Sequence, residues 1–451
     1  MPQSILISGL GPSSLPLTLF LLSLPLPPPL LPRITILERS PLPSLYGQNI
    51  DVRATGLSLL SRLGLTSAIR AATTKEKGVK FVDASNRIWA QFEAGRESRG
   101  EAGAGTAEVE ILRGDLVRVL LAKVGEVSQA VKRGGGAGVE IKYGTTIVGL
   151  EQDGDGVEVV LSTGEKGRFD LVVGADGLGS AVRRKVWGRE GEGERVKELG
   201  MYGAFFSIPR GATDGEWRRW YTAPGRRGVM IRPHRVPERA TVFMFVVNER
   251  DGRLGDVVGG GRGKVQAQKE LFAEYFRGAG WECERLVREM EGAEDFYYDR
   301  VAQVRMDEGG TGEGWSKGRV VLLGDAAYCA SPLSGMGTTL ALNGAYNLAG
   351  ALHQHPDDYA AAFKQYEDKM RPLVKAAQKK APALPRLINP ETKWGVFLLR
   401  LMVMVIYWSG VAKLVFYFAG PQANAVELEE YGLRNLPDEE IDDSLFDDKG
   451  I

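Results

Sequence analysis

A carboxylate follows a short buried strand in the last third of the chain. Val320–Leu323 is apolar and rich in β-branched residues, which is typical of a strand buried on both faces, and Gly324-Asp325 ends it. An aspartate at the carboxyl end of such a strand can accept hydrogen bonds from ribose or ribityl hydroxyls. Pro332 then redirects the backbone toward a helix rich in Ala and Leu.

Two glycines open that helix. Gly335 and Gly337 allow main-chain N–H groups to approach a planar ligand closely. The N-terminus of a helix carries about +0.5 elementary charge, which favours an anionic ring edge. Taken alone, the segment could also be a glycine-punctuated strand-to-helix turn that binds nothing.

A second glycine-rich turn lies near the N-terminus. Ser4–Ser8 is a plausible strand, and the GLGPSS that follows is nearly the GxGxxG fingerprint that holds a pyrophosphate. Gly9 and Gly11 govern the turn and the approach of the backbone. Ser14 replaces the third glycine, which normally permits close helix–strand packing, so the sequence predicts slightly looser packing there.

An acidic residue stands at the distance that this fingerprint requires. Arg33–Leu37 is a second predicted strand, and it ends at Glu38, 24 residues beyond Ser14. A carboxylate there lies where the ribose of an adenosine half needs a bidentate acceptor. We include its neighbour, Arg39, among the candidate cofactor-binding residues.

A third apolar strand also runs into an Asp-Gly turn. The sequence DLVVGADGLGS spans residues 170–180 and contains Asp176, and Arg183 and Arg184 follow it. Three strand-to-turn signatures in this order are hard to obtain by chance. They indicate one dinucleotide-binding domain assembled from distant segments.

The motifs GLGPSS, VVGADGLGSAVR and VVLLGDAAYCASPLSGMGTTLAL together resemble the single-component, class A flavoprotein monooxygenases. That group includes aromatic hydroxylases, tetracycline-modifying monooxygenases and fungal biosynthetic monooxygenases, and the similarity covers most of residues 1–380. The resemblance implies FAD as cofactor and NAD(P)H as co-substrate. It also implies delivery of one oxygen atom from O₂ to a small organic substrate through a flavin C4a-hydroperoxide.

The resemblance further implies roles for single residues. Glu38 would bind the adenosine ribose, and Arg53 would lie near the pyrophosphate. Arg113 occupies the family's Arg-x-x-L position and would reach the flavin phosphates or the ribityl chain. Both arginines could instead be solvated helix charges.

Asp325 would hold the ribityl or pyrophosphate region, and the backbone from Gly335 to Thr338 would face the pyrimidine edge. Thr339 and Gly344 depart from the Asn and Asp common in the family, although neither side chain is needed for these backbone contacts. No catalytic residue is nominated. The candidate cofactor-binding set is Gly9, Gly11, Ser14, Glu38, Arg39, Arg53, Arg113, Asp176, Asp325, Gly335, Gly337 and Thr338.

The composition fits a large enzyme. The chain has 451 residues, 43% of them hydrophobic, which is enough for a sizeable core and two lobes. Lys+Arg and Asp+Glu both number 57, and a formal net charge of zero argues against a general nucleic-acid binder. With two cysteines and three scattered histidines we expect neither a disulfide framework nor a metal site.

The expected fold is α/β with α+β elements. A Rossmann-like FAD-binding domain would comprise residues 1–79, 105–195 and 296–385, and an inserted antiparallel-sheet substrate domain would comprise residues 80–104 and 196–295. Strand-like runs such as 203–208, 228–231 and 240–247 support the insertion. Aromatic residues in those runs are more often core than pocket.

The C-terminal part is apolar and then acidic. Trp394–Gly420 could form a helix of about 40 Å within a helical region spanning 386–426. We expect it to brace the two lobes or to lie at a membrane interface, with a true membrane span as the second choice. The acidic tail, 427–451, is expected to be solvated or disordered, and a cytoplasmic protein with possible membrane contact is the expected localisation.

Three functions remain open at this point. The first is an FAD-dependent monooxygenase that hydroxylates or epoxidises an aromatic or polyketide-like secondary metabolite. A flavin-dependent oxidase or reductase on the same fold would share the cofactor residues. A non-catalytic, membrane-associated flavin-binding protein is a third reading, and the oligomeric state is not predicted.

Overall fold

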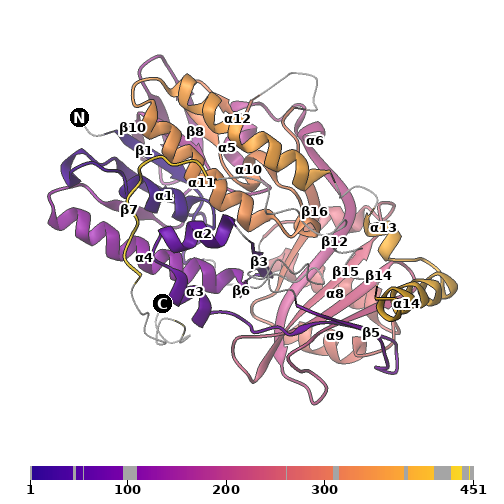
Figure 1. The fold of residues 1–451 in the computed structure, drawn as a ribbon. Helices are drawn as coiled ribbons and strands as arrows, with labels where there is room; N and C mark the ends of the chain where they lie inside the picture. The colour runs from indigo at the N-terminus through magenta and orange to yellow at the C-terminus, as the bar shows by residue number, and fades with distance from the viewer. Residues whose placement is uncertain are drawn as a thin grey trace.

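The computed structural model describes residues 3–43, 47–53, 55–94, 109–260, 262–307, 314–379, 384–410, 428–438 and 446. Figure 1 shows two lobes, each built on one large sheet, with β3 (Asn49–Val52) and β6 (Val109–Leu112) at their junction. These two short strands pair with each other in antiparallel register.

The first lobe is built on a six-stranded sheet in the order β17-β18-β11-β1-β2-β7. Its strands from β18 to β7 are parallel, and β17 adds an antiparallel edge. The inner strands are apolar on both faces, as expected of a sheet covered by helices. The bounds are β1 (Ser4–Ser8), β2 (Arg33–Leu37), β7 (Val139–Lys142), β11 (Leu171–Gly174), β17 (Ser316–Lys317) and β18 (Val320–Leu322).

Helices cover this sheet and bury its core. Every residue of α1 (Ser14–Leu22) is buried, which explains why this segment is apolar on all sides. It packs against α4 (Arg113–Arg133) and α11 (Gly337–Gln354). The other elements of this lobe are α2 (Thr55–Arg62), α3 (Thr66–Ala71), α5 (Ala181–Val186), α6 (Glu192–Arg195), α10 (Asp325–Tyr328), α12 (Tyr359–Gln378), η1 (Pro28–Leu30), η3 (Pro332–Ser334) and the antiparallel sheet of β8 (Ile147–Gln152), β9 (Val157–Leu161) and β10 (Lys166–Phe169).

The second lobe is a seven-stranded sheet in the order β16-β12-β15-β14-β13-β4-β5. All neighbours are antiparallel except the β4–β13 pair. Its strands are β4 (Gly78–Val82), β5 (Ile88–Glu93), β12 (Val196–Pro209), β13 (Arg218–Ala223), β14 (Arg227–Pro233), β15 (Arg239–Val247) and β16 (Tyr297–Val304). Three helices follow β15: α7 (Arg253–Asp256), α8 (Arg262–Phe276) and α9 (Cys283–Gly292). The chain then returns as β16, which pairs with β12. The second sheet therefore extends beyond the domain boundary expected at 295/296.

The C-terminal segments divide between the lobes. After α13 (Leu384–Ile388), α14 (Lys393–Trp408) packs on β5 and β13 at the edge of the second sheet. This placement differs from the expected brace between lobes, and the helix is about 24 Å long. Residues 411–420 of the expected long helix lie outside the described residues. In the described part of the chain, no helix has the length and apolarity needed to cross a bilayer.

The acidic tail is more ordered than expected. Tyr431 is buried against Gly350 of α11, and its hydroxyl donates to Asn347 Oδ1 at 2.8 Å. The backbone N–H of Leu436 donates to the carbonyl oxygen of Arg62. Tyr431 and Leu436 supply apolar area among the acidic residues, so the expectation of a solvated or disordered end is wrong for 428–438.

Candidate active site

The parallel strands bring the predicted motifs to one edge of the first sheet. β1, β2, β11 and β18 are adjacent and parallel, so the turns after each of them lie at the same edge. These turns begin with Gly9, Glu38, Ala175 and Leu323. Ligands of open α/β sheets bind at this edge, outside the carboxyl ends of the strands.

The first turn is tightened by backbone approach and by a serine. Gly9 has φ +105°, and a Cβ there would lie 2.5 Å from the carbonyl oxygen of Ala175, so only glycine fits between the two strand ends. The Ser14 hydroxyl accepts from the backbone N–H of Gly11 at 2.8 Å. Ser14 is fully buried, and its bond to Gly11 closes the turn where the sequence predicted looser packing.

Glu38 lies directly beneath this turn. Its carboxylate accepts from the backbone N–H of Leu10 at 3.2 Å and from that of Ser40 at 2.8 Å, and the residue is buried. The adjacent Arg39 is exposed. Glu38 thus lies against the glycine turn, as an acceptor for an adenosine ribose would have to. The charge of the exposed Arg39 partly offsets the effect of burial, which raises the pKa of Asp299 on β16.

Arg113 crosses from the lobe junction to the glycine turn. It is the first residue of α4, and its side-chain carbons pack over Gly47, where an added Cβ would lie 3.1 Å from Arg113 Cδ. Its Nη2 atom lies 3.7 Å from the position of a Cβ on Gly11. The guanidinium is therefore placed to meet a phosphate lying against the Gly9–Gly11 turn.

Asp325 lies in a recess with groups from the second sheet. Its side chain remains accessible to solvent, yet burial by the surrounding protein raises the pKa of its carboxyl. Arg113 lowers that pKa and Asp299 raises it. Burial also raises the pKa of Asp299, whose carboxylate accepts from the Tyr297 hydroxyl at 2.8 Å. Tyr297 and Asp299 belong to β16, close to the domain boundary expected at 295/296. No sequence motif includes them, so neither residue was predicted to belong to the site.

The turn after Asp325 is strained and contacts β3. Ser331 has φ +73°, a conformation that costs non-glycine residues on the order of 1–3 kcal/mol. A Cβ on Gly335 would lie 3.5 Å from Asp51 Oδ2 and 3.7 Å from Arg53 Nη2. The structure therefore places Arg53 at the Gly335 turn, bonded to Asp51 at 2.8 Å, and its expected position near the pyrophosphate stays a prediction.

The first turn of α11 completes this end of the site. Gly337 is exposed and Thr338 is buried, and the Thr339 hydroxyl accepts from the backbone N–H of Arg53 at 3.3 Å. The residue that departs from the family's Asn thus ties α11 to the end of β3.

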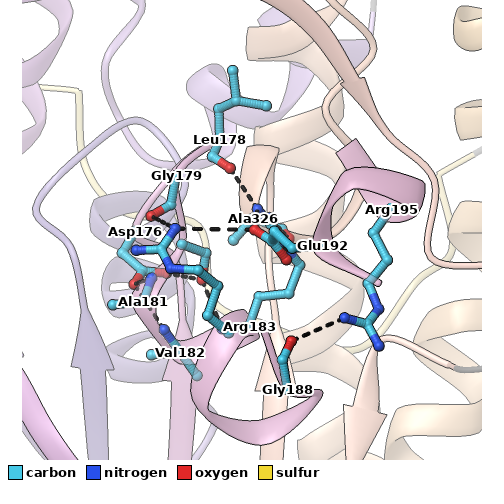
Figure 2. A network of polar contacts seen from close by, with 12 residues as sticks. Asp176, Leu178, Gly179, Ala181, Val182, Arg183, Gly188, Glu192, Arg195 and Ala326 are labelled. Atoms are coloured by element: carbon cyan, nitrogen blue, oxygen red, sulfur yellow. Dashed lines mark hydrogen bonds and ion pairs between the residues drawn. The ribbon is translucent and has the colours of Figure 1, made fainter. Parts of the chain in front are cut away.

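The motif that contains Asp176 and Arg183 holds neighbouring segments of the site in place. Asp176 caps α5: its carboxylate accepts from the Ser180 hydroxyl at 2.5 Å and from the backbone N–H of Ala181 at 2.7 Å. Figure 2 shows how the fully buried Arg183 then joins two motifs. It donates to the carbonyl oxygens of Leu178 at 2.6 Å and Ala326 at 2.7 Å. The sequence reasoning missed this positioning role, although Arg183 was quoted in the motif.

The second sheet turns one face toward the first lobe. Cross-strand register aligns Phe205, Phe243, Met230 and Trp220 in one row across β12, β15, β14 and β13. The Phe205 and Phe243 rings are stacked with centroids 4.2 Å apart. The next row along the strands contains Ser207, Thr241 and Arg232. An aromatic row therefore lies beside a polar row. Strand periodicity predicts which residues share a face of the sheet, but not which residues of neighbouring strands stand opposite one another.

A pocket opens at this face. It is a small recess of about 30 Å³, room for little more than a water molecule and well below the range of small-molecule sites. Its walls come from the segment before and into β3 and from both rows of the second sheet: Gly47, Gln48, Asn49, Phe205, Phe206, Ser207, Arg232, Thr241, Val242, Phe243 and Asp295. Gly47 joins this pocket to the Arg113 side chain and so to the motif edge.

The residues fit a flavin dinucleotide. A cradle at Gly11, the Arg113 guanidinium beside it and the accessible Asp325 carboxylate match a pyrophosphate followed by a hydroxylated chain. The strained Ser331–Gly335 turn and the N-terminus of α11 follow Asp325 in the chain and lie against the end of β3. No side chain of the described residues fills the cradle at Gly11 closer than Arg113.

Comparison with known proteins agrees with this geometry. The sequence profile described as FAD binding domain matches residues 4–258 and 299–381. The FAD-dependent monooxygenase asL4 of Sarocladium schorii is 32% identical, covering 83% of this chain and 86% of its own. Monooxygenase CTB7 of Cercospora beticola is 33% identical, covering 89% and 93%.

The fold has solved counterparts as well. The crystal structure of tetracycline destructase Tet(51) superposes with a TM-score of 0.70 at 26% identity, over 96% of this chain and all of that one. The motif edge, the profile match and the two fungal relatives point the same way. The chain belongs to the FAD-dependent monooxygenases built on this FAD-binding domain.

Proposed function

We propose that the protein uses NAD(P)H and O₂ to hydroxylate or epoxidise a planar, oxygen-bearing small molecule in the pocket at the lobe junction. The observation that carries this proposal is the pairing of an aromatic row with a polar row on the inner face of the second sheet, next to the cofactor edge. A tetracycline destructase shares the fold, which supports a polycyclic substrate. The fungal relatives, which are named as monooxygenases, support oxygen transfer, and we propose an aromatic or polyketide-like secondary metabolite as the acceptor.

Most of the candidate residues receive a role in this proposal. The Gly9–Gly11 turn and Arg113 would hold the pyrophosphate, Glu38 the adenosine ribose and Asp325 the ribityl chain. Arg53 and the backbone from Gly335 to Thr338 would border the flavin ring. FAD, when bound, supplies the redox chemistry with O₂ that the side chains of this pocket lack.

The chain's own residues would orient the substrate and exclude water. Phe205 and Phe243 offer a flat apolar wall to an aromatic ring. Along the adjacent row Arg232 offers a donor to its oxygen substituents, and the Thr241 hydroxyl, whose proton goes to Asn49, offers an acceptor. Leu333, in the turn before Gly335, packs against the same apolar cluster as Phe243, so the cofactor-side turn helps to close the wall.

The test is oxygen transfer from ¹⁸O₂. The purified, FAD-loaded protein would be reduced anaerobically with NADPH or NADH and mixed with ¹⁸O₂ and a panel of phenols, naphthols and anthraquinones. We expect one labelled atom in a product. NADPH oxidation that yields only hydrogen peroxide across the panel favours an oxidase. If neither nucleotide reduces the bound FAD, the monooxygenase and the oxidase are both contradicted.

A matched pair of variants ties the reaction to the pocket. Phe243→Ala removes a ring from the inner face, whereas Met244→Ala alters the outer face of the same strand, in the other core cluster. We expect Phe243→Ala to raise the ratio of peroxide to oxygenated product and Met244→Ala to lower only stability. An equal effect of the two on that ratio would contradict the pocket assignment.

A membrane contact is a separate proposal for α14. Its outer side exposes Trp394, Leu398, Met402, Val405 and Trp408, and its one arginine faces inward, where Arg400 donates to the Thr222 carbonyl oxygen at 3.0 Å. An apolar outer side with tryptophan near both ends and an exposed lysine, Lys393, at its first residue is typical of interfacial helices. We expect the protein to co-sediment with phosphatidylcholine vesicles and the double variant Trp394→Glu/Trp408→Glu to co-sediment less. Equal co-sedimentation of both proteins would contradict this contact.

A further inference from the structure

Four charged side chains meet behind the pocket wall. Arg232 donates from Nε to Glu76 Oε2 at 2.9 Å and from Nη2 to Glu110 Oε2. Arg218 Nη2 lies 2.7 Å from Glu76 Oε1 and 3.5 Å from Glu110 Oε2. The two glutamates are almost fully buried, with side-chain exposures of 1% and 4%.

This cluster joins the two lobes. Glu110 belongs to β6 in the first lobe, whereas Arg218 and Arg232 belong to β13 and β14 in the second sheet. Glu110 Oε1 accepts from Asn49 Nδ2 at 2.6 Å, and Asn49 Oδ1 accepts from the Thr241 hydroxyl at 2.8 Å. Arg232, Asn49 and Thr241 line the pocket, so Glu110 contacts three pocket residues directly or through one bond.

The charges of the cluster balance only when both carboxyls are ionised. Arg218 and Arg232 then neutralise Glu76 and Glu110, and Asp51 on β3 is paired with Arg53. If Glu110 carries a proton, one cationic charge is left in the cluster. That charge adjoins the pocket, because Arg232 is the arginine of the cluster that lines it.

Glu110 is the group of the cluster that can take that proton. Burial raises its pKa; Arg232 lowers it, Glu76 raises it, Arg218 lowers it and Asp51 raises it, and the result is about 7. Thr74 adds a neutral hydrogen-bond donor at 3.2 Å. The pKa of Glu76, held by both arginines, is lowered instead.

We infer that Arg232 anchors an anionic oxygen of the substrate, such as the carboxylate, phenolate or enolate of a planar ring, and that Glu110 takes up a proton from solvent when this anion binds. The anion replaces the negative charge that Glu110 gives up, so the cluster keeps its balance. The ring would then lie on the neighbouring Phe205–Phe243 wall. This inference rests on the proposed function and narrows its substrate class to acidic aromatic molecules.

Calorimetry with 2-naphthoate tests the inference. This anion is ionised throughout pH 6–9, and titration of the FAD-loaded protein in buffers of different ionisation enthalpy counts the protons taken up. At pH 8 we expect close to one proton per bound 2-naphthoate. The dissociation constant should rise up to tenfold per pH unit above pH 7 and be flat below pH 6. 2-Naphthamide, the neutral analogue, should bind with no proton uptake.

Two variants locate the effect. Glu110→Gln keeps a neutral group of the same shape and should bind 2-naphthoate with no proton uptake and little dependence on pH. Arg232→Lys keeps the charge but loses the forked geometry, and should weaken 2-naphthoate at least tenfold while changing 2-naphthamide little. Proton uptake that persists in Glu110→Gln, or absence of 2-naphthoate binding, would overturn the inference.

The same samples separate this inference from the proposed function. FAD content and the rate of anaerobic reduction by NADPH are measured before each titration. Normal values together with pH-independent binding of 2-naphthoate would reject the Glu110–Arg232 subsite alone. Absence of reduction or of oxygen transfer would reject the proposed function, whatever the titrations give.

Discussion

Two buried arginines in this protein are held in different ways. Arg183 donates to two backbone carbonyl oxygens and to one carboxylate, Glu192, at 2.6 Å. Arg232 is held by two carboxylates, Glu76 and Glu110. Two of the three groups that hold Arg183 are carbonyl oxygens, which cannot titrate, whereas both groups that hold Arg232 are carboxylates.

Their positions match this difference. Arg183 lies between the Asp176 and Asp325 motifs, so its network maintains the edge that receives the cofactor (Figure 2). Arg232 lines the pocket between the lobes. A buried arginine held mainly by backbone carbonyls stabilises a fold, whereas a buried arginine held by carboxylates beside a cavity can respond to a ligand.

The largest expected effect breaks the Arg183 network. Arg183→Met should lower the free energy of unfolding by about 3–5 kcal/mol, because it leaves Glu192 and two buried carbonyl oxygens without their donor. Urea unfolding measures the change. Arg184→Met, at a neighbouring position that is 35% exposed, should change stability by less than about 0.5 kcal/mol; equal losses at both positions would refute the contrast.

The second effect is the pH response of the other cluster. The folded-state pKa of Glu110 is raised to about 7 from 4.5, so the folded protein binds more protons than the unfolded chain between these values. Its contribution to stability therefore falls as pH rises from about 4.5 to about 7, on the order of 3 kcal/mol in all. Glu110→Gln should remove this fall. Unfolding at pH 5, 6, 7 and 8 measures it, and parallel curves for both proteins would contradict it.

The third effect separates folding from cofactor binding at the edge that Arg183 maintains. Gly9→Ala should cost about 1–3 kcal/mol, because its φ is +105° and the new Cβ would meet the Ala175 carbonyl. Gly11→Ala meets only Arg113 at 3.7 Å, so it should leave apoprotein stability unchanged and weaken FAD. Fluorescence titration with FAD and apoprotein unfolding distinguish them. The assignment fails if Gly11→Ala binds FAD normally.

The smallest effect concerns the link from the pocket to Glu110. Thr241→Val removes the hydroxyl that donates to Asn49 and should cost about 1 kcal/mol. Asn49 then holds the ionised Glu110 less firmly, so the pKa of Glu110 should rise and the fall in stability should extend to higher pH and become larger. Thr222→Val, on β13 outside the pocket lining, is the control. A shift in both variants would show that the link is not specific.

Sequence reasoning recovered the cofactor edge well because its signals are local. Gly9, Glu38 and Asp325 each end a strand within a few residues of the turn that they serve. The same reasoning did not predict that Arg53 meets the Gly335 turn, because which glycine turn β3 meets depends on packing between distant segments. It also missed the ordered tail, where Tyr431 fills the space above Gly350.

The sequence by itself determined the parallel sheet with its glycine and aspartate turns, the inserted second sheet and the family. These features are encoded over a strand, a turn and the start of a helix. Only the tertiary structure decided that Arg183 meets Ala326, 143 positions away, and that Glu110 meets Arg232, 122 positions away. Burial and strand register create such pairs, and no local pattern records them, so the polar end of the pocket emerged from the fold alone.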